Sequence, residues 1–192
     1  MTEHKRKSSN EQKPPKKITS SYLQNSGLYY LQRFPASVSH FQFVMNRKIK
    51  RSIEHHGTPT MEDAKTMLEK VTDHFKDLGF LNDRLYAQGL ASSLFRKGAS
   101  KKMITARLNQ KGLDAETING CLLDTLPDNA ELIAAARLLQ RRRYGVFATH
   151  PNKQDTQKTM SVLARSGFSY HVANTVMDMS QEECITLISK QA

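Results

Sequence analysis

The chain has 192 residues, a formal net charge of +11 at pH 7 and 38% hydrophobic residues. This hydrophobic share is low for a compact globule, and it favours an elongated shape or a disordered tail. No apolar run approaches the roughly 18 residues of a membrane span, and no secretory signal follows Met1, so we expect a cytoplasmic protein. Cys121 and Cys184 match no metal-ligand or redox spacing and are predicted to be small core residues.

Residues 1–20 form the first segment, which carries six Lys or Arg, two Pro and almost no apolar side chain. Such a segment cannot offset its ordering entropy by burial, so we predict a disordered basic tail that is dispensable for folding. Two roles stay open for it: a passive extension, or an arm that contacts phosphates.

Residues 21–80 are expected to hold the first group of helices. Apolar residues at helical spacing begin at Leu28, Pro35 breaks the pattern, and Ser37 can cap a second helix that runs to about Ile53. A third helix is predicted from a Thr60 cap to Leu78, with Gly79 as its end.

Residues 81–127 predict three further helices. Asn82 or Asp83 caps the first, Ser100 caps the second, which ends at Gly112, and Asp114 caps the third. Residues 128–192 repeat this order, with helices expected around 132–139, 154–166 and 168–179, and the last residues, 180–192, extending the final helix.

A half-hidden internal repeat ties the last two segments together. The stretch at 107–114 reads RLNQKGLD and that at 162–169 reads VLARSGFS, 55 residues apart, each with a Leu four residues before the Gly. A period of this length indicates stacked supersecondary units. We therefore predict an all-α chain of three tandem three-helix repeats in an elongated, curved array. The first repeat is atypical, because Ile49 stands where the others have Gly.

The charges are segregated along the chain. From Arg84 to Leu113 there are seven basic residues and no acid, whereas acids gather between Glu62 and Asp77. A one-signed face of this kind predicts attraction to a polyanion, although a solvated face is the simpler explanation for any single charge. The candidate filament- or DNA-binding residues are Arg84, Arg96, Lys97, Lys101, Lys102, Arg107, Lys111, Arg141, Arg142 and Arg143.

The central segment resembles the RecX regulatory-protein family. The resemblance lies in Phe80-Leu81-Asn82-Asp83-Arg84-Leu85-Tyr86-Ala87, in Arg96-Lys97-Gly98, and in the later Lys111-Gly112-Leu113. It covers about residues 26–180 and implies tandem three-helix repeats and a modulator of the RecA recombinase in DNA repair. It also implies a RecA–DNA filament as the partner, most often with inhibition of ATP hydrolysis and strand exchange. Direct contact with single- or double-stranded DNA is a further expectation, as is a monomer that does not bind membranes.

Catalytic motifs are missing from the sequence. There is no Gly-Lys-Ser/Thr loop for ATP, and adjacent His55 and His56 point in different directions on a helix with no third metal ligand placed. We therefore expect no enzyme activity, no cofactor and no metal. Tyr86 is interpreted as a core residue rather than a base-stacking platform. The alternative function is a general basic DNA-binding protein without a recombinase partner.

Overall fold

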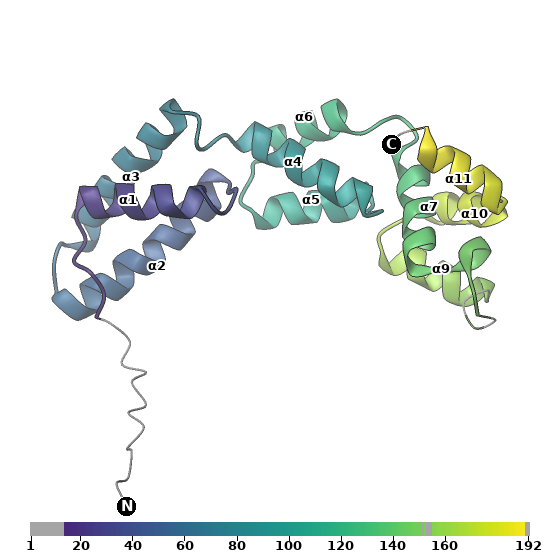
Figure 1. Cartoon of the computed structure of the whole chain (residues 1–192), viewed down its shortest axis with the longest axis horizontal. Helices are drawn as coiled ribbons and strands as arrows, with labels where there is room; N and C mark the ends of the chain where they lie inside the picture. Colours follow the sequence, from purple (N-terminus) through teal and green to yellow (C-terminus); the bar gives the residue numbers. More distant parts are fainter. Residues whose placement is uncertain (1–13, 151, 153–154, 191–192) are drawn as a thin grey trace, which may run out of the picture. The chain divides into compact units, whose positions relative to one another are not determined.

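The computed structural model describes residues 14–150, 152 and 155–190, and over these ranges it contains helices and no strand (Figure 1). The predicted all-α class is confirmed. The described chain forms two compact units: residues up to Phe34 with Phe41–Phe80, and Pro35–His40 with the residues from Leu81 onward. No helix in the described ranges is both long enough and apolar enough to cross a bilayer.

The first unit contains α1 (Ser20–Leu31), most of α2 (Val38–His56) and α3 (Met61–Asp77). Phe41 is fully buried at its centre, with the Phe75 ring edge-on at 5.7 Å between centroids. Gly27 of α1 lies against these two rings, so close that a Cβ there would be 2.7 Å from Phe75. The small residue therefore lets α1 pack closely onto the aromatic pair.

The segment before α1 differs from the prediction of a disordered tail over 1–20. Residues 1–13 lie outside the described residues, but residues 14–20 pack on the first unit. Ile18 is only 2% exposed, Ser52 Oγ donates to the Lys16 carbonyl at 2.9 Å, and Thr19 caps α1. Residues 14–20 are therefore held on the first unit, because the Ile18 side chain is buried there.

Over its described residues, the second unit contains the start of α2 and seven further helices. They are α4 (Asp83–Arg96), α5 (Lys101–Gln110), α6 (Ala115–Thr125), α7 (Ala130–Arg142), α9 (Thr156–Arg165), α10 (Tyr170–Asp178) and α11 (Gln181–Ser189). A 3₁₀ turn, η1 (Gly145–Phe147), follows α7.

Helix α7 lies at the centre of the second unit. Its residues from Ile133 to Leu139 are all buried, and α4, α10 and α11 pack against it. Three consecutive alanines, Ala134 to Ala136, account for this, because their small side chains let neighbouring helices approach on several sides.

The repeated sequence marks two identical helix ends. Leu108 and Leu163 are fully buried, and their carbonyls accept the amides of Leu113 and Phe168, the apolar residues that follow Gly112 and Gly167. Both glycines have positive φ, which closes the helix in the way glycine favours. The internal repeat therefore corresponds to one structural unit used twice, α4–α6 and α7–α10.

The end of the chain departs from the expected extension of the last helix. Met179 is extended, Ser180 begins a new helix, and its side chain and that of Glu183 form a reciprocal capping box. The additional helix α11 packs on α7, and it buries Cys184 completely. The division into a tail and three repeats at 20, 80 and 127 stays a prediction.

Candidate functional site

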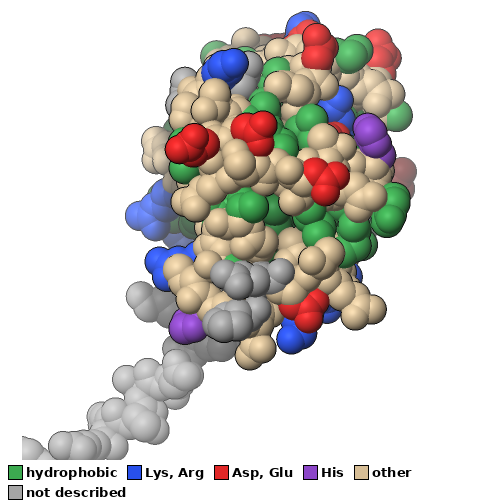
Figure 2. All heavy atoms as spheres, turned by 90° about the vertical axis from the view of Figure 1, so that its right-hand side faces the viewer, with side chains coloured by type: hydrophobic (Ala, Val, Ile, Leu, Met, Phe, Trp, Pro, Cys, Tyr) green, Lys and Arg blue, Asp and Glu red, His purple; other side chains and the backbone are tan. Residues whose placement is uncertain are grey.

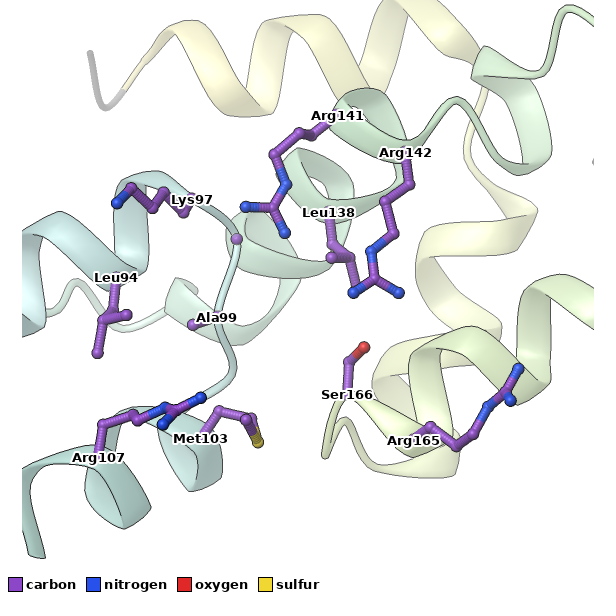
Figure 3. Close-up of a pocket in the computed structure, with 11 residues that line it drawn as sticks. Leu94, Lys97, Ala99, Met103, Arg107, Leu138, Arg141, Arg142, Arg165 and Ser166 are labelled. Carbon is purple, nitrogen blue, oxygen red and sulfur yellow. The ribbon is translucent and has the colours of Figure 1, made fainter. Parts of the chain in front are cut away.

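A basic groove runs across the second unit between α4–α5 on one side and α7–α9 on the other (Figure 3). It has a volume of about 260 Å³. We call it the arginine groove, and it is lined by Leu94, Lys97, Gly98, Ala99, Met103, Arg107, Leu138, Arg141, Arg142, Arg165 and Ser166.

The groove forms where three helices end. Lys97 is the C-cap of α4, Arg141 and Arg142 belong to the last turn of α7, and Arg165 is the last residue of α9. Cations at a helix C-terminus are stabilised by the negative end of the helix dipole, which explains locally why each is basic. Together the three ends bring cations into one place that a sequence pattern does not show.

Gly98 sets the floor of the groove between α4 and α5. Its φ is +75°, and a Cβ built on it would lie 2.6 Å from the Leu138 amide nitrogen and 2.7 Å from the Ala134 carbonyl. The turn after α4 therefore presses directly on the backbone of α7. A glycine is required both for its conformation and for this approach.

The charge of the lining is one-signed. Lys97 and the four arginines are the charged residues among the described residues that line the groove, with no Asp or Glu. In Figure 3, Arg141 and Arg142 extend from the end of α7 toward the hollow, and Arg107 reaches toward it from α5. The Arg165 side chain is directed away, since its Nε donates to the Ser161 carbonyl of its own helix at 3.1 Å.

Arg137 lies one turn before Arg141, and its side chain is buried between α7 and α4. It is 8% exposed, and its guanidinium carbon stands 4.7 Å from the centroid of the Phe95 ring. Burial, with a smaller contribution from nearby Arg96, lowers the pKa of the Arg137 guanidinium. This cation–π contact joins α7 to α4, and so it stabilises the relative position of the two helices that form opposite walls of the groove.

The structure brings together four of the ten predicted binding residues: Lys97, Arg107, Arg141 and Arg142. The other six do not line the groove: Arg84, Arg96, Lys101, Lys102, Lys111 and Arg143. A binding role remains a prediction for all ten. Arg84 forms an ion pair with Asp124 at 2.8 Å, so an acid 40 residues away balances a charge that stands in an acid-free stretch of sequence.

The start of α5 is a place where free backbone amides favour an anion, and it already holds an internal one. The Lys101 amide donates to Glu131 Oε1 of α7 at 2.6 Å, and Ser100 Oγ accepts from the Met103 amide. An external phosphate at this helix start would have to displace the Glu131 carboxylate. The side chains of Lys101 and Lys102 are nevertheless exposed.

Sequence reasoning missed Arg165 and the apolar floor. Arg165 lies two residues before Gly167, inside the repeat copy itself, but it aligns with the uncharged Gln110 of the other copy, so the repeat gave no signal for it. Met103 has the helical spacing of a buried residue, together with Ile104 and Leu108. It is 37% exposed and lines the groove, because α5 turns only Ile104 and Leu108 fully inward.

Other predicted residues lie where expected. Cys121 and Cys184 are buried, and burial raises the pKa of both thiols. Tyr86 is partly buried against the core, as interpreted from the sequence. Figure 2 shows another face of the molecule, where acidic and hydrophobic side chains intermingle and basic ones lie mostly near the margin. The basic character is therefore not uniform over the surface.

The helix order and the groove define a helical-repeat protein with an arginine-rich groove on its second unit. The family model for the second three-helix domain of RecX matches residues 82–122, which span most of α4–α6. The chain is 35% identical over 168 residues to the regulatory protein RecX of Myxococcus xanthus, covering 86% of this chain and 89% of that protein. It belongs to the RecX regulatory-protein family.

Further relatives agree with this assignment. RecX of Agrobacterium fabrum is 28% identical over 170 residues, which cover 88% of this chain and 89% of the relative. The crystal structure of RecX from Lactobacillus salivarius has a TM-score of 0.58 at 22% identity, with 87% of this chain and 97% of that chain covered. Another crystal structure of a regulatory protein RecX has the same TM-score at 20% identity, with 83% and 72% covered. These structures share the helical fold.

Proposed function

We propose that this protein binds the RecA–DNA filament and lowers its ATP hydrolysis and strand exchange. Membership of the RecX family supports the RecA partner, and the arginine groove supports a binding surface for an acidic target. The single observation that carries the site is that Lys97, Arg107, Arg141 and Arg142 line one groove without a lining carboxylate among the described residues. Lys101 and Lys102 are exposed at the start of α5 and add to the basic character of this unit.

The proposed role is regulatory and rests on binding rather than on bond chemistry. The protein would act in the cytoplasm as a monomer, without a cofactor, and would occupy a surface that the filament needs for its own cycle. DNA repair by homologous recombination is the process in which such a regulator would act.

A general DNA-binding role is the second candidate, and the exposed basic side chains favour it. Salt dependence separates the two. Binding that rests only on six to ten phosphate contacts loses about three to five decades of affinity between 50 and 200 mM salt. A filament binder would retain selectivity for RecA-coated DNA over bare DNA across that range.

The test is RecA-catalysed ATP hydrolysis on single-stranded DNA, with the protein titrated in. The variant Arg107→Ala/Arg141→Ala/Arg142→Ala removes three groove cations. A matched control, Lys50→Ala/Lys65→Ala/Lys70→Ala, removes three exposed cations from α2 and α3 in the first unit. We expect the groove variant to need at least tenfold more protein for half-maximal inhibition, and the control to remain near wild type.

The opposite results would reject the proposal at two levels. If the wild-type protein leaves RecA activity unchanged at saturation, the RecA partner is wrong. If both triple variants weaken inhibition equally, net charge rather than the groove is responsible. Far-UV circular dichroism and thermal melts of each variant establish that the comparison is between folded proteins.

A further inference from the structure

The arginine groove has an apolar floor beneath its basic rim. Leu94, Ala99, Met103 and Leu138 supply the floor, while the cations stand around it (Figure 3). A surface that only holds phosphates has no need of such a floor. The ligand that satisfies both parts carries negative charges on either side of an apolar group.

The size of the hollow limits what enters it. Its volume of about 260 Å³ is below the roughly 300–1,000 Å³ of sites that enclose whole small molecules. It has room for an apolar side chain or two, with the rest of the ligand lying across the rim.

The floor of the groove also lacks the features of a nucleic-acid site. The amides of Lys97, Gly98 and Ala99 all donate to carbonyls at the end of α4, so this turn offers no backbone cradle for a phosphate. No Phe, Tyr or His is among the described residues lining the groove, so a splayed base would find no aromatic ring to stack on.

We infer that the arginine groove binds an acidic peptide segment of a partner protein, with an apolar side chain of that segment inserted between Met103 and Leu138. The acidic side chains on either side would pair with Arg107, Arg141 and Arg142, which is the charge complementarity that the rim provides. The inference rests on the proposed function, since it names the chemistry by which the groove would recognise a protein partner.

Fluorescence anisotropy with three labelled probes tests this on the full chain. The first probe is a nine-residue peptide of alternating Asp and Glu with one central Leu. The second replaces that Leu by Ser, and the third is a 15-nucleotide oligo-dT. We expect the Leu peptide to bind at least about tenfold more tightly than the Ser peptide, since the Leu side chain leaves water.

Two variants separate the floor from the rim. Met103→Gln keeps the size and net charge of an exposed helical position but makes the floor polar, and it should abolish the preference for Leu over Ser. Arg107→Ala/Arg141→Ala/Arg142→Ala should weaken both peptides at least tenfold, whereas Lys50→Ala/Lys65→Ala/Lys70→Ala should weaken neither by more than about twofold.

Three results would overturn the inference. One is equal affinity for the Leu and Ser peptides in the wild-type protein. Another is oligo-dT binding that the groove variant alone reduces, with no peptide bound, which would make the groove a nucleic-acid site. The third is a dimer in sedimentation equilibrium that the groove variant dissociates, which would place a second copy there. Peptide binding without an effect on RecA would instead reject only the proposed function.

Discussion

Ser37 and Ser100 make the same two hydrogen bonds at two places in the second unit. Each caps its own helix, accepting the amide of His40 or Met103, and each Oγ donates to the carbonyl just before a helix-ending glycine, at Lys111 or Ser166. Both serines are fully buried. One serine hydroxyl therefore caps the start of its own helix and also donates a hydrogen bond to a carbonyl at the end of another helix.

The neighbouring amides repeat the relationship. The Val38 amide donates to Asp83 Oδ1 at 2.8 Å, and the Lys101 amide donates to Glu131 Oε1 at 2.6 Å. Each carboxylate comes from the first turn of the helix that begins the next three-helix group. The sequence repeat therefore extends to the contacts between successive helices, as well as to the shape of each helix end.

Ser100→Ala should destabilise the second unit more than the same change at another cap. The variant loses both the cap and the bond to the Ser166 carbonyl at 2.7 Å, whereas Ser169→Ala loses only an exposed cap to the Val172 amide. A cap costs about 1 kcal/mol, and a buried carbonyl left without its partner adds about 1–3 kcal/mol. Urea unfolding of the two variants, compared with wild type, checks the difference. Equal losses would mean that water takes over the Ser166 carbonyl.

Much of the fold could be predicted from local signals, and what escaped prediction depends on distant residues. Pro35 correctly indicated a helix break and Ser37 a helix cap, and Gly112 and Gly167 indicated helix ends. Such residues can be interpreted from sequence because they act on their immediate neighbours. The second bond of Ser37 reaches Lys111, 74 residues away. No local pattern carries a contact of that kind.

The candidate site shows the same division. The acid-free stretch from Arg84 to Leu113 pointed to Lys97 and Arg107, because charge segregation is visible in the sequence. The balance of Arg84 by Asp124, and of the α5 start by Glu131, depends on helix packing. The apolar floor could not be predicted for another reason. Met103 has the helical spacing typical of a core residue, and its partial exposure depends on how the neighbouring helices pack.

Ile18→Ala should destabilise the first unit, against the expectation that residues 1–20 are dispensable. Ile18 is 2% exposed, and truncation of a buried Ile costs about 2–5 kcal/mol. A matched control is Lys17→Ala at the adjacent exposed position, which should cost less than about 0.5 kcal/mol. Thermal unfolding measures both. An unchanged melting temperature for Ile18→Ala would show that this segment does not contribute to folding.

We expect the Asp114 cap to contribute to stability in a way that is lost at acidic pH. Hydrogen bonds from the Thr117 amide and hydroxyl, at 2.7 and 2.9 Å, lower the pKa of the Asp114 carboxyl. Because the folded state has the lower pKa, this contribution is present above the unfolded value and is lost as the pH falls through the folded one. Asp114→Asn keeps a capping oxygen but does not titrate. Its unfolding free energy should therefore depend less on pH below about pH 4 than that of wild type. Parallel curves from pH 6 to 2.5 would contradict this.

Gly98→Ala should be the most damaging single-methyl change in the second unit. Two costs combine: alanine at positive φ costs about 1–2 kcal/mol, and the new Cβ would lie 2.6 Å from the Leu138 amide nitrogen, a backbone atom that cannot rotate away. Gly79→Ala is the control, since Gly79 has the same φ of +75° with nothing within 4 Å. We expect a loss of about 1–2 kcal/mol at Gly79 and at least about 1 kcal/mol more at Gly98, measured by urea unfolding. The groove should change with it, because displacing the turn after α4 separates Lys97 from Arg141. Equal losses at the two glycines would mean that α7 yields at this contact.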